Sequence, residues 1–477
     1  MIERKKLVLI FLLALCVRIT LLGLLHHTCF FSGITVGDGD IAHHISTGEG
    51  FVIDKEFVNV VSHMQNQTQR LWDYEDFKRP EEEKLVPYWH SLPGYAGLLA
   101  VTYKIFGHER YIYLQILQAI ADSFLIFFIY WIAAWLFNPG VGFFSALLFA
   151  FWIPEARLSI AALHDAPMTL ILVLAVFFFI KYLATDSRWF ALTPAVVLGL
   201  GSFIRSDYIF LPAFFGIALY LYKGKFKKSV VFVISSLLLI FLILFPWGMR
   251  NYHLFGKFQV TRATLWQSVW EGFGEFNNPF GAVLDDGVTF EQVKKEFPQI
   301  EYDSPQYQEL LKGKVIRALK SHPMWYIGML PKRLANMLLL RNFNDWGFPL
   351  DPKLSFRKVK LPLLVYLKYM AKKYPSQLIY RIMPRVVLEP SLLLLALMGL
   401  WVYRKDWRRM MLIFCIPVYA ILSHLPVYWE PRYILPAQFP YLIFCVAFLQ
   451  KLYWRHKNIR ERLLNKHSSP INDENGC

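Results

Sequence analysis

The chain has 477 residues, of which 56% are hydrophobic, 17% are aromatic and 18% are charged, and its formal net charge is +16. With a mean hydropathy of +0.35, this composition excludes an ordinary soluble protein and predicts an integral membrane protein. The apolar runs are continuous rather than alternating, which excludes a transmembrane β-barrel. None of the five cysteines forms a CxxC pair, so neither a disulfide framework nor a zinc site is predicted.

Apolar stretches recur almost from end to end, although some are shorter than the ~20 residues that a helix needs to cross a bilayer. They predict an all-α, polytopic membrane protein with about ten transmembrane helices. The first stretch lacks a small-x-small cleavage site, so we interpret it as a retained helix and not as a signal peptide. The ten stretches are residues 7–25, 111–137, 140–154, 166–184, 190–204, 207–222, 229–247, 386–403, 410–427 and 434–453.

Four clusters of basic residues indicate the orientation, because such residues accumulate in cytoplasmic loops. With ten spans and two cytoplasmic ends, all four clusters lie on the cytoplasmic side. The positive charge then reflects topology and contact with anionic membrane lipids, and no nucleic-acid partner is expected. Residues 1–453 are predicted to form a single transmembrane domain, and residues 454–477 a cytoplasmic tail. The clusters are residues 4–6, 223–228, 404–409 and 451–466.

Two large polar segments, residues 26–110 and 248–385, then become extracytoplasmic loops. Residues 92–107 are apolar but short, and counting them as a span would invert the basic clusters that follow. We therefore expect a juxtamembrane helix that lies in the membrane interface. Residues 323–340 and 361–371 could form similar helices in the second loop.

A pair of carboxylates, Asp38 and Asp40, follows the first span in the stretch Gly37-Asp38-Gly39-Asp40. The flanking glycines predict a turn, which could be merely solvated. Its place near the membrane, on the side of the large loops, favours catalysis instead. One carboxylate could take a proton from an acceptor hydroxyl, or both could hold a divalent metal ion through their oxygens. The first role needs one aspartate and no metal. The second needs more ligands, which His43 and His44 could contribute, although exposed loop histidines are more often inert.

Further ionisable residues occur at the predicted outer ends of the spans. Arginines at a membrane edge often only reach toward lipid headgroups. Arg205, Arg250 and Arg432 lie on the side that basic residues usually avoid. Their position favours another explanation, namely binding of a lipid phosphate, because a guanidinium keeps its charge and binds phosphate bidentately. The residues are Glu155, Arg157, His164, Asp165, Arg205, Asp207, Arg250, Glu430 and Arg432.

Four motifs over residues 1–450 occur in an order and spacing that resemble the GT-C glycosyltransferases, specifically the family of protein O-mannosyltransferases and bacterial lipid A aminoarabinose transferases (glycosyltransferase family 39). This resemblance implies a GT-C-like fold, a polyprenyl-phosphate sugar donor and inversion at the anomeric carbon. The motifs are Gly37-Asp38-Gly39-Asp40 leading to Gly48-Glu49-Gly50-Phe51, His90-Ser91-Leu92-Pro93-Gly94-Tyr95 through Phe106-Gly107, Pro246-Trp247-Gly248-Met249-Arg250-Asn251-Tyr252, and Glu430-Pro431-Arg432-Tyr433.

The resemblance also implies roles for individual residues. The general base is expected to be an aspartate of the first loop, which by position is Asp38, with Asp40 as the second candidate. Binding of the donor phosphate is assigned to Arg205, Arg250 and Arg432. The remaining predicted substrate-binding residues are His90, Tyr95, Glu155, Asp165, Asn251, Tyr252 and Glu430.

Together these patterns predict a multi-pass glycosyltransferase of the inner (plasma) membrane with an extracytoplasmic active site. It would transfer a hexosyl or pentosyl group from a polyprenyl-phosphate donor to a lipid, polysaccharide or protein acceptor. The chain has no Walker loop, GxGxxG, GxSxG or HExxH motif, so no cofactor is predicted. One alternative is a transporter or flippase of lipid-linked saccharides, which would place charges near mid-span; here they gather on one face. Another is a polysaccharide polymerase or ligase, which would not require the first-loop aspartate.

Overall fold

The computed structural model describes residues 4–25, 32–54, 84–302, 304–338 and 387–467, together with five positions between 365 and 372. These parts are mainly helical, as predicted, and their strands are two short ones. Most of the helix predicted over residues 361–371, and residues 468–477 of the tail, lie outside the described residues.

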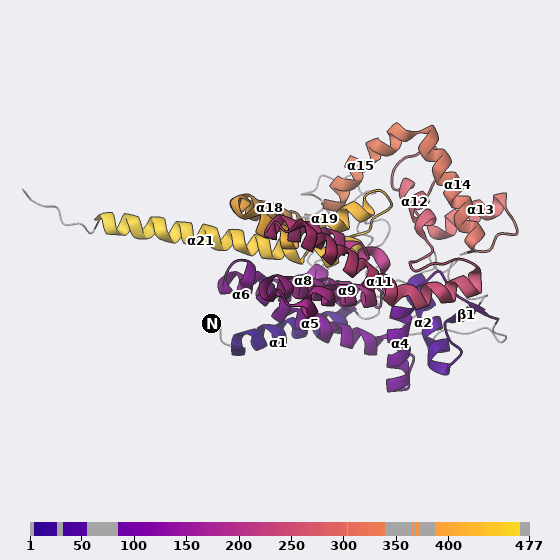
Figure 1. The fold of residues 1–477 in the computed structure, drawn as a ribbon, viewed down its shortest axis with the longest axis horizontal. Coiled ribbons are helices and arrows are strands. Elements are labelled where there is room, and N and C mark those ends of the chain that lie inside the picture. Colours follow the sequence, from indigo (N-terminus) through magenta and orange to yellow (C-terminus); the bar gives the residue numbers. More distant parts are fainter. Residues whose placement is uncertain are drawn as a thin grey trace, which may run out of the picture.

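Each of the ten predicted spans contains a helix, and the helices pack together in one bundle (Figure 1). The match in position arises because a long apolar run in an apolar environment pairs its backbone groups by forming a helix. The helices are α1 (Arg4–Leu25), α5 (Tyr111–Leu136), α6 (Pro139–Ala150), α8 (Met168–Thr185), α9 (Arg188–Gly201), α10 (Leu211–Lys223), α11 (Phe226–Phe255), α18 (Glu389–Val402), α19 (Trp407–His424) and α21 (Phe439–His467).

Four helices, α1, α5, α8 and α11, are long and apolar enough to cross a membrane. The number rises to six if two bent helix pairs each count as one span: α6 with α7 (Ile153–Ser159), and α20 (Pro431–Ile434) with α21. The chain is therefore an integral membrane protein. That all ten helices cross the bilayer stays a prediction.

Close packing of aromatic and small residues holds the bundle together. The ring of Phe179 in α8 stacks on Phe215 of α10 at 4.5 Å between centroids. Gly142 brings α6 against α5, because a Cβ at this position would lie 2.6 Å from the carbonyl oxygen of Tyr130. One ion pair lies inside the bundle and not at its end: Nε of Arg18 in α1 is 2.5 Å from Oδ2 of Asp122 in α5. The prediction that charges gather on one face therefore has an exception here.

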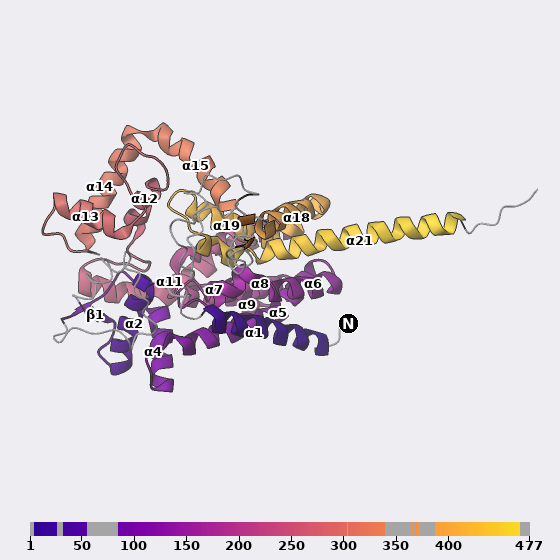
Figure 2. The ribbon, with the colours of Figure 1, turned by 180° about the vertical axis from the view of Figure 1, so that it is seen from behind.

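The polar segments gather at one end of the bundle, while α1 begins and α21 projects at the opposite end (Figures 1 and 2). Helices occur where residues 92–107 and 323–340 predicted them; their place in a membrane interface stays a prediction. We call the end of the bundle with the polar segments the outer end. Its elements are α2 (Ser32–Thr47), β1 (Val52–Asp54), β2 (Leu85–Pro87), α4 (Pro93–Phe106), α12 (Leu265–Phe273), α13 (Asp286–Glu296), α14 (Pro305–Ser321) and α15 (Pro323–Leu338).

The turn predicted at Asp38 and Asp40 is wrong, because both residues lie within α2. Helical residues two positions apart point about 200° away from each other. The glycines between and beside the two carboxylates are accommodated in the helix, which packs against α4 and β1. Strands β1 and β2 are antiparallel, with Ile53 opposite Val86. The two carboxylates therefore face different surroundings.

Candidate active site

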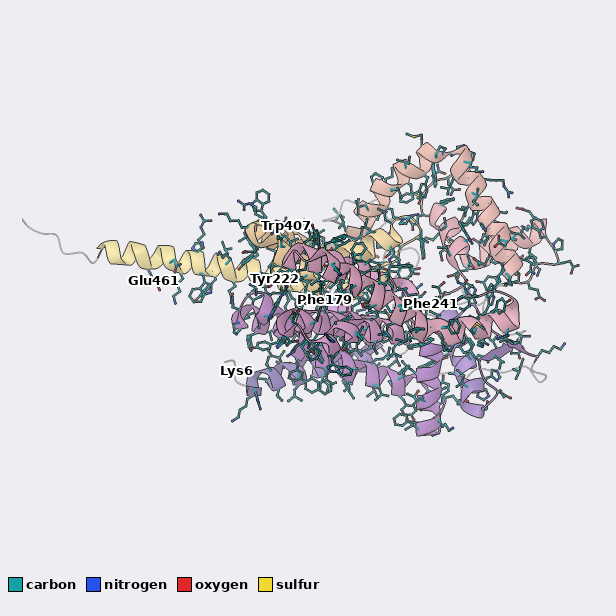
Figure 3. All side chains as sticks on the ribbon, in the orientation of Figure 1. Lys6, Phe179, Tyr222, Phe241, Trp407 and Glu461 are labelled. Carbon is teal, nitrogen blue, oxygen red and sulfur yellow. The ribbon has the colours of Figure 1, made fainter. Side chains whose placement is uncertain are left out.

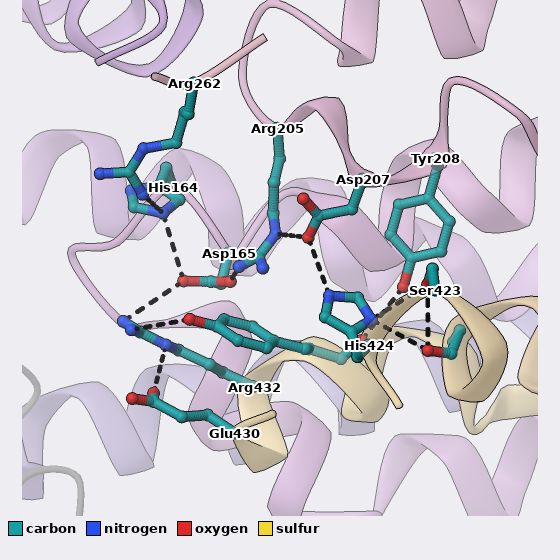
Figure 4. Close-up of polar contacts among 12 residues, drawn as sticks. His164, Asp165, Arg205, Asp207, Tyr208, Arg262, Ser423, His424, Glu430 and Arg432 are labelled. Carbon is teal, nitrogen blue, oxygen red and sulfur yellow. Dashed lines mark hydrogen bonds and ion pairs between the residues drawn. The ribbon is translucent and has the colours of Figure 1, made fainter. Parts of the chain in front are cut away.

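A cluster of ionisable side chains lies at the outer end of the bundle, where segments distant in sequence meet (Figure 4). We call this group the polar cluster. Its members come from α2, from the segments before α8 and after α9, from the loop after α11, and from the α19–α20 connection. They are Asp38, His164, Asp165, Arg205, Asp207, Arg262, His424, Glu430 and Arg432.

Asp165 lies at the centre of the polar cluster and is fully buried. It forms an ion pair with Arg205. Its Oδ2 lies 3.7 Å from Nη1 of Arg432 and 3.6 Å from Nε2 of His164. A buried carboxylate is tolerated only with such partners. Asp165 therefore brings the guanidinium groups of Arg205 and Arg432 to one point.

Arg205 follows the end of α9, in a break before a short 3-10 helix (Ser206–Tyr208). Its Nε lies 2.5 Å from Oδ2 of Asp207, and the same oxygen lies 3.2 Å from Nε2 of His424. Burial alone would raise the pKa of Asp207, but Arg205 and His424 outweigh it and hold the pKa well below its ordinary value. The carboxylate is therefore ionised at neutral pH and orients Arg205, whose guanidinium also lies 4.0 Å from the ring centre of Tyr433.

Arg432 lies in α20 and is oriented by its neighbours in sequence. Nε of Arg432 is 2.6 Å from Oε2 of Glu430, and its Nη2 donates to the hydroxyl of Tyr433 at 3.3 Å. The hydroxyl of Tyr428 donates to Glu430 in turn. The Glu430-Pro431-Arg432-Tyr433 motif thus places one guanidinium beside Asp165.

His164 connects Asp38 to this group. Arg262 lies 3.3 Å from Nε2 of His164, and because a guanidinium can only donate, we assign the ring proton to Nδ1. That nitrogen lies 3.6 Å from Oδ2 of Asp38. Burial lowers the pKa of His164 and Asp38 opposes the shift, but the charge of Arg262 adds to burial, so the pKa falls to about 4. His164 is therefore neutral at physiological pH.

Asp38 itself is 3% exposed. The hydroxyl of Ser91 donates to its Oδ1 at 3.1 Å. Within the part of the chain that the structure describes, Oδ2 accepts no hydrogen bond. Tyr95 of α4 lies nearby, with its ring centre 6.4 Å from that of His164. One oxygen of Asp38 is thus held by Ser91, and the other faces Nδ1 of His164 at 3.6 Å.

Asp40 lies in a separate environment. Its Oδ2 accepts the backbone N–H of Asp54 at 3.2 Å and lies 3.5 Å from Nε2 of His44. Nearby, ligand atoms of His43, His44 and Glu49 lie within 4.8 Å of one another, so these three residues could hold a metal ion. Asp40 therefore connects α2 to β1.

Arg250 and Asn251 also make contacts elsewhere. Arg250 donates to the carbonyl oxygens of Tyr88 at 3.0 Å and Phe51 at 2.9 Å, which ties α11 to β1 and β2. Asn251 donates to the carbonyl of Gln259 at 2.7 Å. Among the described residues, Arg250 forms no ion pair with Asp165, the carboxylate that Arg205 and Arg432 share. The phosphate-binding role of Arg250 stays a prediction. Its contacts hold α11 against the segments that contain β1 and β2.

The remaining predicted substrate-binding residues occupy three different positions. His90 is buried, with its ring 6.1 Å from those of Tyr88 and Tyr302. Glu155 is buried in α7. Tyr252 is 52% exposed near the end of α11.

Four members of the polar cluster were not among the predicted site residues. His164 and Asp207 were noted in the sequence only as ionisable residues at the ends of spans, and Arg262 and His424 were not noted at all. Arg262 lies in an irregular loop, and nothing around it in the sequence distinguishes it. His424 ends α19 only a few residues before Glu430. A histidine at the end of an apolar stretch could have indicated that it is a candidate site residue.

The comparison with known families bears on the class of protein. Residues 90–249 match the family of dolichyl-phosphate-mannose-protein mannosyltransferases. This confirms the predicted resemblance, and the matched segment contains His164, Asp165 and Arg205 of the polar cluster. No curated protein matches the chain significantly in sequence.

Solved structures of an oligosaccharyltransferase from Archaeoglobus fulgidus are also similar. Its apo form has a TM-score of 0.46 at 11% identity, covering 98% of this chain and 53% of that one. Its complex with an inhibitory peptide and a dolichol-phosphate has a TM-score of 0.46 at 13% identity, covering 98% and 52%. The form tethered to an acceptor peptide has a TM-score of 0.47 at 11% identity, covering 95% and 50%. The present chain thus spans about half the length of these proteins.

Proposed function

We propose that this protein is a membrane glycosyltransferase that moves a sugar from a polyprenyl-phosphate donor to a hydroxyl of a lipid, polysaccharide or protein acceptor. The observation that carries the proposal is a buried series of contacts. His164 lies between Asp38 and Asp165, and Asp165 in turn contacts Arg205 and Arg432. The family match over residues 90–249 supports the class of reaction and the lipid-phosphate donor.

Arg205 and Arg432 are the groups that would receive the donor phosphate. Both contact Asp165, and each has a second carboxylate that orients it, Asp207 or Glu430. Oriented cations in a site that excludes water stabilise charge that grows on a leaving group, typically by about 3–4 kcal/mol per contact. Leaving polyprenyl phosphate is such a group, so the arginines would act mainly in the transition state.

Asp38 would act as the general base. Ser91 holds Oδ1, and Oδ2 would take the proton of the acceptor hydroxyl. The hydroxyl oxygen attacks the anomeric carbon from the face opposite the phosphate, the new C–O bond forms, and the bond to the phosphate oxygen breaks with its electron pair. The configuration at that carbon inverts. These steps need no cofactor and no nucleotide.

The experiment compares wild type, Asp38→Asn and Asp40→Asn, each purified in detergent and supplied with polyprenyl-phosphate sugars and lipid, polysaccharide and peptide acceptors. Loss of a positioned base typically costs about 10²–10⁴-fold in rate, and we expect this loss for Asp38→Asn with donor binding retained. Asp40→Asn is the matched control and should keep most of its turnover wherever it stays folded.

Two results would contradict the proposal in different ways. If Asp40→Asn is inactive and Asp38→Asn turns over normally, the base is misassigned. If wild type binds the donor but releases no polyprenyl phosphate with any acceptor, a transporter of lipid-linked saccharides becomes the better account.

A further inference from the structure

A groove opens at the end of the bundle opposite the polar cluster. Its walls are the first residues of α9 and α11, and the last turn of α8 closes it; its volume is about 860 Å³. Tyr222, just before α11, and Lys6, near the start of α1, both lie toward the end at which α21 projects (Figure 3). The groove therefore belongs to the end of the bundle that carries the chain termini.

Basic side chains dominate the mouth of this groove. Its lining includes four of them, Arg188, Lys225, Lys227 and Lys228, against the single carboxylate of Asp186. Lys228 is paired with Asp186 at 2.5 Å. Among the residues that the structure describes, none of the other three forms an ion pair with a carboxylate. Three cations thus remain to bind an anion.

The depth of the groove is apolar. Leu192 of α9 and Val231 of α11 are 40% and 57% exposed along its walls, and Phe232 is buried beneath them, stacked on Tyr182 at 5.7 Å. Both α8 and α11 are long and apolar enough to cross a membrane. An occupant would therefore place an anionic group among the cations and an apolar chain along the helices.

The groove is remote from the polar cluster. Asp165 and Arg205 lie at the start of α8 and just after the end of α9, whereas the groove uses the opposite end of each helix. The 18 residues of α8 separate the two by about 27 Å at the usual helical rise. A lipid in the groove would not be the sugar donor bound at the polar cluster.

We infer that the groove binds an anionic glycerophospholipid, with the phosphodiester headgroup held by Arg188, Lys225 and Lys227 and one acyl chain lying on Leu192 and Val231. Basic pockets between helices at a membrane surface suit such headgroups. The apolar walls favour a lipid over a free phosphate ion, which would gain nothing from them.

The test measures binding of phosphatidylglycerol and phosphatidylcholine to lipid-depleted protein by native mass spectrometry. The variant is Lys225→Gln/Lys227→Gln, in which both residues are exposed. The control, Lys5→Gln/Lys6→Gln, removes the same charge from the exposed start of α1. At roughly fivefold in affinity per cation near a lipid surface, the variant should bind phosphatidylglycerol about 25-fold more weakly, and the control should match wild type.

A second variant, Val231→Gln, tests the apolar wall and should weaken lipid binding without changing the binding of inorganic phosphate. The inference is overturned if the lysine variant binds phosphatidylglycerol like wild type, or if phosphatidylcholine binds equally well. It is also overturned if inorganic phosphate binds and the lipid does not, or if the lysine variant loses binding of polyprenyl phosphate but not of phosphatidylglycerol. Loss of glycosyl transfer would not bear on it, because the proposed reaction occurs at the other end of the bundle.

Discussion

Asp38 and Asp40 are separated by one residue, yet the helix directs them to different neighbours. Asp38 faces Ser91 and His164, and Asp40 faces the backbone of Asp54 and the ring of His44. Both carboxylates are almost fully buried, so their contacts are with the protein and not with solvent. At the scale of single residues, the surroundings of each carboxylate, and not its position in the sequence, distinguish Asp38, the proposed base, from Asp40, which makes structural contacts.

The pairing of His44 predicts a pH dependence of stability. Burial lowers the pKa of His44, but Asp40 and Glu49 outweigh it and raise the pKa to about 9. Because the folded-state pKa lies above the ordinary 6.5, the stabilisation is complete below about pH 6.5 and is lost as the pH rises through 9.

We therefore expect the melting temperature of wild type in detergent to fall between pH 6.5 and 9 by about 1 °C more than that of His44→Gln for each 1 kcal/mol lost, since a chain of 477 residues has a large entropy of unfolding. The measurement is differential scanning fluorimetry over that range. Parallel curves for the two proteins would show that the His44 contacts contribute nothing to folding.

The break between α9 and α10 is the element that presents Arg205 and Asp207. It is held by hydroxyl groups from both sides: Tyr419 donates to the carbonyl of Asp207 at 2.6 Å, and Tyr208 donates to the carbonyl of Tyr433 at 3.1 Å. Helix α4 fixes it from a third direction, because the N–H of Gly94 donates to the carbonyl of Phe203 at 2.8 Å. The position of Arg205 therefore depends on the packing of α4.

This contact predicts a strong effect of Gly94→Ala. The added Cβ would lie 2.7 Å from the backbone of Phe203, so α4 and the break must separate. Overpacking of this kind costs about 1–3 kcal/mol, and displacement of Arg205 should reduce glycosyl transfer at least tenfold.

Gly97→Ala in the same helix is the matched control, since a Cβ there meets nothing within 4 Å. Turnover and melting temperature of the two variants are compared side by side. Equal behaviour would mean that the approach of α4 does not position Arg205.

At the scale of the whole molecule, a buried contact of Arg333 joins the helices of the outer end to the bundle. Arg333 of α15 is fully buried and lies 2.9 Å from Oε2 of Glu275; it also donates to the carbonyls of Leu425 at 2.9 Å and Gly272 at 2.6 Å. Oε1 of Glu275 accepts the N–H of Trp429 at 3.3 Å. Because Trp429 directly precedes Glu430, the outer helices reach the polar cluster through this contact.

Removing one partner of this pair should loosen the outer end. We expect Arg333→Met to lower the free energy of unfolding by about 3–5 kcal/mol, since Glu275 is left buried without its cation. Helices α12 to α15 should become sensitive to limited proteolysis, and transfer should fall as Glu430 and Arg432 shift.

A double-mutant cycle with Glu275→Gln gives the control. The double variant should be less destabilised than the sum of the two single variants, because it leaves no unpaired buried charge at position 275 or 333. Additive losses, or unchanged proteolysis in Arg333→Met, would contradict a coupling role for the pair.

The sequence by itself determined the class of protein and the positions of the main helices. An apolar run has few ways to satisfy its backbone in an apolar environment, so the ten predicted spans each contain a helix. The motif Glu430-Pro431-Arg432-Tyr433 contains both partners of the Glu430–Arg432 ion pair, because that contact is local in sequence.

Only the tertiary structure decided which charged residues meet. Asp165 contacts Arg205 and Arg432 from segments far apart in the chain. Arg262 contacts His164 from a loop with no distinguishing pattern, and His424 contacts Asp207 from the end of α19. Arg250 shared the predicted signature of Arg205, yet it is directed to backbone carbonyls of the outer loop. The physical reason is that a buried charge is stabilised by whichever groups packing brings within a few ångströms, and contacts across the fold are not encoded in local spacing.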